Sequence, residues 1–333
     1  MAESIKTVGL NKTYDNFQAW EDDADGNSTT GTPWWAEFYS GADLGALVIA
    51  GWSDPPTAEA HRIKLYVASG HQHNGISGGA TSSSTASADL ISISMSFVTL
   101  DGLHADQNST SGNYYAINMA TGAAVEGTTV ERCLIKSSDA YCVFGYGKAG
   151  AVFNVRNNIM IKDGESNELP VCRLIGLSTY PVYNVYHNVF TGAGVAQYGL
   201  QTNTAKGSLD VVAENNISFD NDDGDYALAG TSITANNNIS SDATADDDGG
   251  SGNLIDQTDT DILTDPSNDD FRLKSTSAAI GAGVTIASVT TDILGTSRPK
   301  GGSYDIGPYE YTVAGPLMDS PSIASVISQG MIT

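Results

Sequence analysis

The chain carries little charge for its length, and the charge it has is mostly negative. Charged residues make up 16% of the 333 residues, against about 25% in ordinary domains. Lys and Arg number 15 and Asp and Glu number 39, which gives a formal net charge of -24. Binding to a phosphate backbone or an anionic lipid surface requires clustered Lys and Arg. We therefore expect no nucleic-acid partner and no attachment to an anionic membrane.

Cysteines, long apolar runs and an export leader are also scarce or missing. Three cysteines, Cys133, Cys142 and Cys172, are too few and too odd in number for a disulfide framework, and their apolar surroundings predict buried thiols. No segment reaches the ~18 apolar residues of a membrane span. Residues 1–6 lack the basic and then apolar pattern of a secretory signal. The sequence therefore predicts neither membrane insertion nor conventional export.

One short pattern returns along the middle of the chain. An alternating apolar run ends in two polar residues, usually both asparagine, and an aliphatic residue follows. The copies are Asn157-Asn158-Ile159, His187-Asn188-Val189, Asn215-Asn216-Ile217 and Asn237-Asn238-Ile239. A repeat of some two dozen residues is typical of a stacked solenoid. Strand-length runs without a helical period predict coils of parallel strands.

The second asparagine of each pair is expected to have a structural role. Amide side chains at equivalent corners can hydrogen-bond up and down the stack, and Asn tolerates the left-handed backbone of a tight corner. The predicted ladder is Asn158, Asn188, Asn216 and Asn238. One coil cannot bury its own apolar face, whereas a column of coils shares a continuous core. We predict an all-β protein with a right-handed parallel β-helix.

Side-chain alternation predicts which residues face that core. Phe153, Val155, Ile159 and Ile161 are expected to share one face of their run. Repeating coils are expected over residues 93–257, and the Gly/Ser/Thr-rich stretch 76–88 is interpreted as a long loop.

The two ends of the chain differ from the coils. Residues 1–30 are predicted to form a cap, with a strand and then a short amphipathic helix over residues 15–23. Asp15 is the expected N-cap of that helix, with Phe17 and Trp20 on one face. The β-helix is assigned to residues 31–311, including a C-terminal closure at 258–311. Residues 312–333 are interpreted as an extended tail.

Motifs in the closure carry a family resemblance. Phe271-Arg272-Leu273, Ser277-Ala278-Ala279-Ile280-Gly281, Arg298-Pro299 and Tyr304-Asp305-Ile306-Gly307 occur in that order. This order resembles the C-terminal signature of right-handed parallel β-helix repeat proteins. Residues 7–22 look like the N-terminal cap of such proteins, including ones encoded by bacteriophages. The chain departs from the family pattern at Ala278, Gly281 and Pro308. The resemblance implies the fold more than the function, because this fold carries lyases, hydrolases, adhesins and structural parts alike.

Candidate catalytic groups are few. Lyase chemistry on such a fold would need an Arg or Lys base beside calcium held by carboxylates. Candidate bases are Arg156, Lys162 and Arg173, with Asp163, Glu165 and Glu168 nearby in sequence. We interpret these residues as parts of a solvated loop that follows a strand.

Two acidic runs resemble calcium loops in part. Residues 21–26 fit over the first half, but the twelfth position of that loop is Thr32, where a bidentate Glu is needed. Residues 220–225 match more loosely. The candidate Ca²⁺ ligands are Asp23, Asp25, Asp222, Asp223 and Asp225. Exposed acidic loops without metal are the alternative.

Histidines and tryptophans near the start of the chain also need an interpretation. His71 and His73 could face one way on a strand, but without a third ligand nearby we interpret them as part of a polar loop. Trp34, Trp35 and Trp52 could stack against sugar rings, although sealing the transition from cap to coils is the interpretation we favour.

The tail completes the functional interpretation. It has one charge, Asp319, and a series of apolar side chains that could anchor the protein: Leu317, Met318, Ile323, Val326, Ile327, Met331 and Ile332.

With the phage resemblance and no export signal, we predict a non-enzymatic virion protein assembled in the host cytoplasm. It would be a capsid decoration, head-fibre or tail-associated β-helix. We expect a homotrimer that contacts other virion proteins and host glycans. The alternatives are a polysaccharide lyase or hydrolase acting as a depolymerase, and a glycan-binding adhesin.

Overall fold

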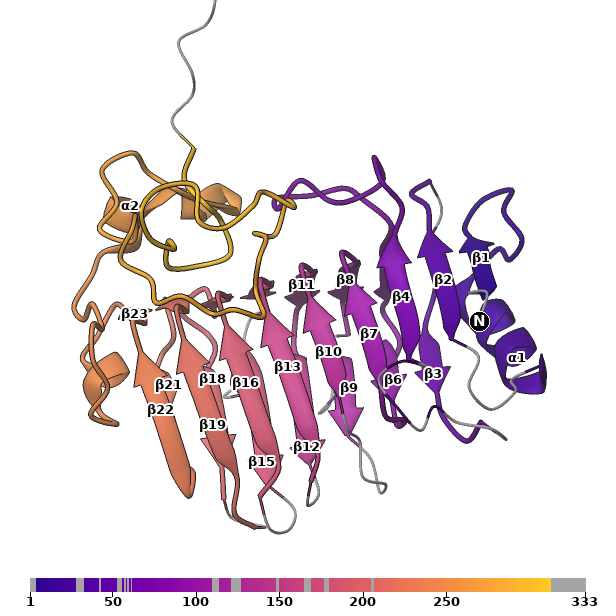
Figure 1. The fold of residues 1–333 in the computed structure, drawn as a ribbon, viewed down its shortest axis with the longest axis horizontal. Coiled ribbons are helices and arrows are strands. Elements are labelled where there is room, and N and C mark those ends of the chain that lie inside the picture. Colours follow the sequence, from indigo (N-terminus) through magenta and orange to yellow (C-terminus); the bar gives the residue numbers. More distant parts are fainter. Residues whose placement is uncertain are drawn as a thin grey trace, which may run out of the picture.

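The computed structural model describes residues 4–27, 33–41, 43–52, 56, 58, 60, 62–109, 114–120, 127–147, 150–164, 169–176, 180–204 and 207–312. Its regular structure is almost all β-strand, and the strands stack as a parallel β-solenoid (Figure 1). This arrangement confirms the predicted fold class. Within these residues, no helix has the length and apolar character needed to cross a membrane.

Three parallel sheets form the walls of the solenoid. Sheet A contains β1 (Ser4–Val8), β2 (Trp34–Phe38), β4 (Ile63–Val67), β7 (Val98–Asp101), β10 (Thr128–Glu131), β13 (Val152–Arg156), β16 (Val182–Tyr186), β19 (Asp210–Glu214) and β22 (Ser232–Asn236). Sheet B contains β5 (Thr81–Ser84), β8 (His104–Gln107), β11 (Leu134–Ser137), β14 (Ile159–Lys162), β17 (Val189–Thr191), β20 (Ile217–Phe219) and β23 (Ile239–Ser240). Sheet C contains β3 (Leu47–Ile49), β6 (Ile91–Ile93), β9 (Tyr115–Ala120), β12 (Tyr141–Gly147), β15 (Cys172–Gly176), β18 (Tyr198–Asn203) and β21 (Gly224–Ala227).

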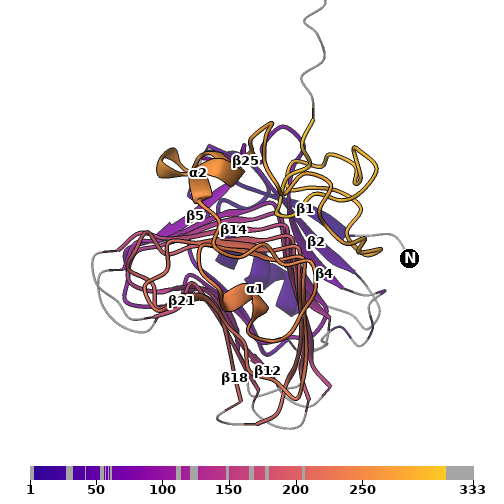
Figure 2. The ribbon, with the colours of Figure 1, turned by 90° about the vertical axis from the view of Figure 1, so that its left-hand side faces the viewer.

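From β4 to β23 the chain visits the sheets in the order A, B, C, and equivalent strands pair in parallel. Val130 pairs with Val155, which in turn pairs with Val185 one coil further along. Figure 2 looks along the stack, where the strands of each sheet lie over one another. Residues one coil apart are therefore direct neighbours, although more than 20 residues separate even the nearest of them in sequence, as in the pair Asp210 and Ser232.

The coils begin earlier than predicted. β2 and β4 already belong to sheet A, and the stretch expected to be a loop contains β5, which pairs with β8 in sheet B. The sequence pattern missed β5 because its residues, Thr81–Ser84, are all hydroxylated and show no apolar alternation. Backbone pairing holds this strand, and the buried Ser82 hydroxyl donates to Gly45 O at 2.6 Å. The predicted start at residue 93 was wrong for this reason.

A helix covers the N-terminal end of the stack. α1 spans Phe17–Asn27, and its first turn is capped by Asn16, whose Oδ1 accepts from Ala19 N at 2.9 Å. The cap is therefore Asn16 and not the predicted Asp15, and the helix extends past the predicted end at residue 23. Phe17 and Trp20 are fully buried, as expected of an end plug, and Phe17 packs edge-on against Phe38 with ring centroids 4.5 Å apart.

The corner between sheets A and B combines a left-handed residue with a buried asparagine. Asn157, His187, Asn215 and Asn237 have φ between 51° and 60°. Asn158 N and Nδ2 both donate to Asn188 Oδ1, at 3.0 and 3.1 Å, and the same two bonds recur from Asn188 to Asn216 and from Asn216 to Asn238. These amides are at most 1% exposed. Each turn therefore supplies the acceptor that the turn before it needs.

The ladder extends one step beyond the predicted positions. Asn238 N donates to Asn253 Oδ1 at 2.8 Å. The repeat pattern missed Asn253 because Gly252, rather than a second asparagine, precedes it. Gly252 has φ 72° and so occupies the left-handed position of the corner. A left-handed residue followed by Asn would have been the more general signal.

The corner also changes which side chains face the core. Phe153 and Val155 lie in the interior, and so does Met160, whereas Ile159 and Ile161 belong to a separate apolar cluster. The prediction that all four share one face was wrong, because the turn at residues 157 and 158 breaks the alternation. The second cluster lies between the outer surface of sheet B and the C-terminal closure. Cys133, Cys142 and Cys172 are buried free thiols in the interior.

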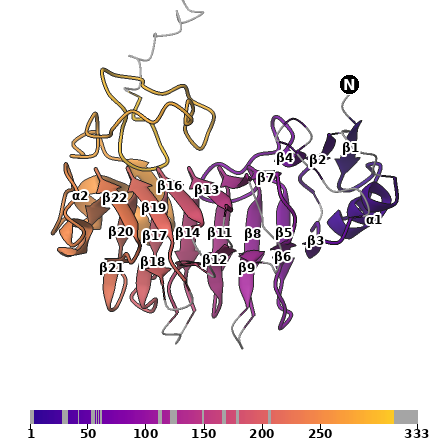
Figure 3. The same cartoon turned by 60° about the horizontal axis from the view of Figure 1, so that its bottom comes forward.

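The closure folds back over sheet B and the A–B corner, on the opposite side of the solenoid from sheet C (Figures 2 and 3). Its elements are α2 (Asp259–Ile262), β24 (Leu263–Asp265), η3 (Pro266–Asn268) and β25 (Asp270–Leu273), with β24 and β25 antiparallel. The short helix η2 (Thr244–Asp246) precedes the closure and packs against β21 and β23. The left-handed corner residues bind the closure. Asn157 Nδ2 donates to Thr291 O and Asn215 Nδ2 to Val284 O, both at 2.8 Å.

Candidate functional site on sheet C

The three candidate bases lie in three different environments. Lys162 is fully buried and donates to Ser138 O at 3.3 Å, and burial lowers its pKa. Arg156 pairs with Glu131 at 2.7 Å and donates to Ser288 O in the closure. Arg173 points outward from β15 on sheet C. Asp163 is exposed, and Glu165 and Glu168 lie outside the described residues. The structure does not bring these groups together as a base beside a metal.

The predicted calcium ligands are also separated. Asp23 accepts from the Tyr14 hydroxyl, Asp25 lies in the same α1 helix, and Asp222 and Asp223 are exposed. Asp225 is fully buried, where its carboxylate accepts from Asn221 Nδ2 at 2.7 Å and from Ser241 Oγ at 2.7 Å. Across the described ranges, no three or more His, Cys, Asp or Glu side chains are grouped so that they could hold a metal ion. The Ca²⁺ prediction therefore gains no support from this geometry.

His71 and His73 have separate partners. His71 Nδ1 lies 2.8 Å from Ser40 Oγ. His73 Nε2 lies 2.7 Å from Arg132 O, and Gly75 N donates to His73 Nδ1. Burial lowers the pKa of His73 to about 4, so its ring is neutral and Nε2 carries the proton that Arg132 O accepts. This histidine attaches the loop at residues 70–79 to the A–B corner.

The tryptophans divide between the interior and the surface. Trp34 and Trp52 are 7% and 5% exposed and belong to the core near α1. Trp35 points outward on sheet A, where its ring lies edge-on to Tyr66 with centroids 6.1 Å apart. Trp34 and Trp52 therefore seal the transition from the cap to the coils, whereas Trp35 is a surface aromatic residue.

The register of sheet C places one outward residue per coil in a continuous row. Its members are Val48, Ser92, Asn118, Phe144, Arg173, Gln201 and Ala227. Strand alternation turns their neighbours Ile117, Val143 and Leu200 inward, where they are fully buried. Side chains of the row are thus held on a rigid sheet and separated by the spacing of adjacent strands, about 4.8 Å.

Phe144 of this row packs with three further aromatic rings, those of Tyr115, Tyr141 and Tyr146. Tyr115 stacks on Phe144 with centroids 4.4 Å apart and an interplanar angle of 22°. Tyr141 lies 5.3 Å from Tyr115 and Tyr146 lies 6.2 Å from Phe144. These distances are typical of favourable aromatic pairs. We call these four rings, together with Asn118, Arg173 and Gln201, the sheet C platform.

Three polar groups of the platform are incompletely bonded. Asn118 Nδ2 donates to Asp89 Oδ2 at 2.6 Å, which fixes its Oδ1 as an acceptor, and Arg173 Nη1 donates to Tyr141 Oη at 3.2 Å. Asn118 Oδ1, Arg173 Nε and Gln201 Oε1 are buried atoms with no hydrogen-bond partner in the described part of the chain. The row therefore presents an acceptor on Asn118, then the ring of Phe144, then a donor on Arg173 and an acceptor on Gln201.

The carboxylate nearest the platform is already engaged. Asp89 accepts from Tyr115 N, Ser92 Oγ and Asn118 Nδ2. Burial raises the pKa of the Tyr115 hydroxyl, which therefore stays protonated at neutral pH. Arg173 contributes a permanent positive charge. The platform can stack against a flat ligand and exchange hydrogen bonds with it.

Comparison with known proteins identifies no family for this chain. No protein-family model matches the sequence, and no curated protein sequence is similar to it. The structural match is to pectate lyase Pel9A. Its crystal structure aligns with a TM-score of 0.47 and 10% sequence identity, over 93% of this chain and 98% of that chain.

Sequence inspection did not reveal the platform. Tyr115, Tyr141, Phe144 and Tyr146 form no motif, and Tyr115 lies in a separate run of the sequence from the other three. Only pairing of β9 with β12, which sets Tyr115 opposite Tyr141, brings them together. The one usable signal was that Tyr115 and Tyr141 are separated by about one coil length.

The predicted anchoring tail falls outside the described residues, which end at Thr312. Leu317, Met318, Ile323, Val326, Ile327, Met331 and Ile332 therefore have no structural account. The virion location, the trimer and the contacts with other virion proteins stay predictions from the sequence.

Proposed function

We propose that this protein is a glycan-binding β-solenoid whose sheet C platform holds an extended oligosaccharide. The observation that carries this proposal is the row of unpartnered polar atoms beside stacked aromatic rings. Along the row, Phe144 separates Asn118 Oδ1 from Arg173 Nε, and Gln201 Oε1 follows Arg173. A buried polar group without a partner costs about 1–3 kcal/mol. A ligand that supplies the missing partners offsets this cost.

Sugars have the matching chemistry. A hydroxyl group donates one hydrogen bond and accepts others, so neighbouring hydroxyls can serve the donor on Arg173 and the acceptors on Asn118 and Gln201. The apolar face of a sugar ring packs on an aromatic ring such as Phe144 or Tyr146. Because the row crosses successive coils, it can contact several units of a chain that runs along the solenoid axis.

The same geometry favours binding over cleavage. Inverting hydrolysis uses two carboxylates roughly 6.5–9.5 Å apart, and the carboxylate beside the platform, Asp89, is held by three donors. Arg173 is a poor proton acceptor because its guanidinium stays charged. We therefore place the adhesin-type function ahead of the lyase or hydrolase alternative.

A glycan array followed by calorimetry tests the proposal. The full-length protein is screened on bacterial and plant polysaccharides, and the best oligosaccharide is titrated into the wild type and variants. We expect Phe144→Ala and Arg173→Ala each to weaken binding about tenfold or more. The control is Trp35→Ala, which removes an outward aromatic ring from sheet A and should leave binding unchanged.

Two results would contradict the proposal. One is equal affinity of the platform variants and the wild type. The other is release of oligosaccharides from a bound polysaccharide by the pure protein, which would restore the enzyme alternative.

The virion role is kept as a proposal that rests on the sequence. In that setting the platform would contact host glycans and residues 312–333 would attach the trimer to the particle. Deleting residues 312–333 should abolish co-purification with particles while glycan binding by the platform persists. Unchanged incorporation of the truncated protein would rule out the anchoring role of these residues.

A further inference from the structure

A cavity of about 300 Å³ lies between the outer surface of sheet B and the closure. On the sheet side, Ile161, Thr191 and Phe219 are register partners on three successive strands. On the closure side, Leu263 and Phe271 belong to β24 and β25. The closure covers the opposite side of the solenoid from sheet C (Figure 2). The cavity therefore has an apolar floor and is separate from the platform.

The apolar lining continues to the mouth of the cavity. Ala193 is exposed and Pro266 is partly exposed, and both belong to the lining. The volume is at the lower end of the range for small-molecule sites, about 300–1,000 Å³. This space suits a slender group with an aliphatic part, such as a single long side chain.

Four carboxylates line the same cavity, and no Lys, Arg or His does. Asp163 and Asp220 directly follow β14 and β20, and both are exposed. Asp259 begins α2, and Asp269 precedes β25. Among the described residues, no ion pair reaches Asp163, Asp220 or Asp259. Three of the four negative charges are therefore open to a cation from outside.

The fourth carboxylate shows how a cation binds at this rim. Lys136 Nζ pairs with Asp269 at 2.5 Å, and Lys136 is the register partner of Ile161 on the neighbouring strand. An ammonium on an aliphatic stem is thus held by an aspartate of the lining beside the apolar row. Long basic side chains commonly bind in this way, with the stem on apolar surface and the charge at its edge.

The electrostatics of the rim also favour a cation. Desolvation raises the pKa of Asp220, and the nearby charge of Asp259 raises it further. Desolvation raises the pKa of Asp163 as well. A positive charge bound among these carboxylates would lower both pKa values, and the ligand would gain the corresponding attraction.

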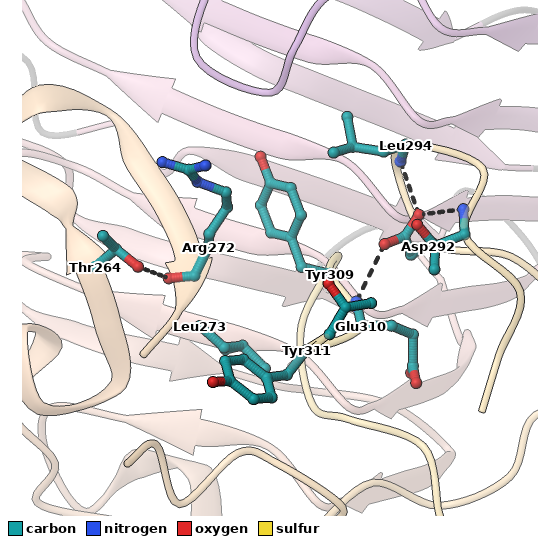
Figure 4. A pocket seen from close by; sticks show the side chains of 10 residues that line it. Thr264, Arg272, Leu273, Asp292, Leu294, Tyr309, Glu310 and Tyr311 are labelled. Atoms are coloured by element: carbon teal, nitrogen blue, oxygen red, sulfur yellow. Dashed lines mark hydrogen bonds between the residues drawn. The ribbon is translucent and has the colours of Figure 1, made fainter. Parts of the chain in front are cut away.

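A neighbouring cavity of the closure lacks this feature. Figure 4 shows its Asp292, which accepts from Leu294 N at 2.9 Å, from Thr296 N at 2.7 Å and from Glu310 N at 3.1 Å. Glu310 in turn is bound by Arg298 at 2.7 Å. These carboxylates are occupied by the protein itself, so that cavity offers a cation nothing comparable.

Acidic surface extends beyond the cavity. Between residues 207 and 271 the sequence contains no Lys or Arg, whereas Asp is frequent. Asp222 lies two residues after Asp220, and Asp261 and Asp265 lie in the closure segment that lines the cavity; all three are exposed. A surface of this kind attracts a basic protein surface over a distance. A small free cation would need only the cavity.

We propose that this cavity receives an arginine side chain from a basic segment of a partner protein. The aliphatic stem packs on the apolar lining, and the guanidinium lies among Asp163, Asp220 and Asp259. A guanidinium is weakly hydrated and binds carboxylates through a planar fork. No three described acidic side chains are grouped for a metal ion, which leaves an extended organic cation as the match. The site uses no platform residue, so it stands whether or not the platform binds glycans.

An NMR titration of the full-length protein with N-acetylarginine methylamide tests the proposal. We expect saturable shifts of the amide signals of Ala193 and Asp220. The matched probe is N-acetylcitrulline methylamide, which has nearly the same shape without the charge. It should bind about tenfold more weakly or less, because it cannot pair with the carboxylates.

Two variants distinguish the cavity from the general negative charge of the protein. Asp220→Asn should weaken binding of the arginine probe about fivefold, and Asn tolerates the left-handed backbone at residue 220, where φ is 58°. The control, Asp222→Asn, removes the same charge from an exposed residue outside the lining. It should bind the probe as the wild type does.

A peptide distinguishes a protein partner from a free cation. The pentapeptide acetyl-Lys-Gly-Arg-Gly-Lys-amide should bind about tenfold more tightly than the single arginine derivative, because its lysines reach the surrounding acidic surface. Asp220→Asn should weaken binding of the peptide as well.

Four outcomes would overturn the proposal. The first is that the arginine probe causes no saturable shift at the cavity. The second is that the citrulline probe binds equally well. The third is that Asp220→Asn and Asp222→Asn have the same effect, which would indicate diffuse attraction only. The fourth is that the peptide binds no more tightly than the arginine derivative, which would replace the protein partner by a free cation.

Discussion

Arg298 Nη2 donates a hydrogen bond of 3.1 Å to Asn157 Oδ1, across 141 residues of sequence. The same guanidinium pairs with Glu310 through Nη1 at 2.7 Å, and both side chains are 0% exposed. Asn157 is one of the left-handed corner residues, and its Nδ2 also binds the closure at Thr291 O. The corner that turns each coil thus also docks the C-terminal segment.

Breaking the Arg298–Glu310 pair should destabilise the protein strongly. Glu310→Ala leaves a fully buried guanidinium without its carboxylate, which costs about 3–5 kcal/mol of unfolding free energy. Lys136→Ala is the control, because the Lys136–Asp269 pair is partly exposed and should contribute about 1 kcal/mol or less. Denaturant titration of both variants checks this. Equal effects would show that burial does not decide the contribution of these pairs.

A substitution in the asparagine ladder should be similarly costly. Asn216→Ala removes the acceptor of Asn188 N and Nδ2 and the donor to Val185 O, all of them buried. We expect a loss of roughly 3 kcal/mol or more of unfolding free energy. The control, Asn184→Ala, removes an outward amide that bonds to Asn154 at 3.0 Å, and solvent can replace that bond. Thermal and denaturant unfolding should rank the two variants in this order, and the reverse order would contradict the structural role of the ladder.

Asp225 should make stability depend on pH in mildly acidic solution. Burial raises its pKa from 3.8 to about 6 in the folded protein, so the folded state binds a proton more tightly than the unfolded chain does. The contribution of Asp225 to the unfolding free energy is therefore largest below about pH 4, falls as pH rises towards 6, and is lost above that, with a size of roughly 3 kcal/mol at most.

Asp225→Asn should flatten the pH dependence over that window. Melting temperatures measured from pH 4 to pH 7 for the wild type and this variant give the comparison. Superimposable slopes would show that another group carries the dependence.

Gly75 should tolerate a side chain less well than its neighbour Gly78. A methyl group on Gly75 would lie 1.7 Å from Tyr309 Oη, whereas one on Gly78 would meet nothing within 4 Å. Both have positive φ, 84° and 76°, so both alanine variants carry the left-handed penalty of about 1 kcal/mol. We expect Gly75→Ala to cost clearly more than Gly78→Ala in thermal melts. Equal losses of melting temperature in the two variants would mean that a side chain at residue 75 does not clash with the Tyr309 hydroxyl.

Much of the fold could be predicted because its signals are local. The coil repeat, the buried asparagines at the corners and the capping aromatics Phe17 and Trp20 all appear within short stretches of sequence. Each reflects a requirement that one coil imposes by itself: a left-handed corner, an amide that satisfies the turn, or an apolar plug at an open end.

The errors arose where a neighbouring segment decided the outcome. Ile159 and Ile161 have the pattern of core residues of the coil. They lie under the closure instead, and the closure begins about 100 residues later in the sequence. β5 has no apolar alternation and exists because β8 offers it a backbone partner.

By itself, then, the sequence determined the parallel β-helix and its asparagine corners, because these depend on residues adjacent in the chain. Only the tertiary structure decided which residues of distant segments lie together on the surface. Strand register aligned Asn118, Phe144 and Arg173 from separate coils on sheet C. Docking of the closure placed Asp259 with Asp163 and Asp220 around one cavity. Both sites depend on contacts between distant segments, and such contacts leave no pattern in any one stretch of sequence.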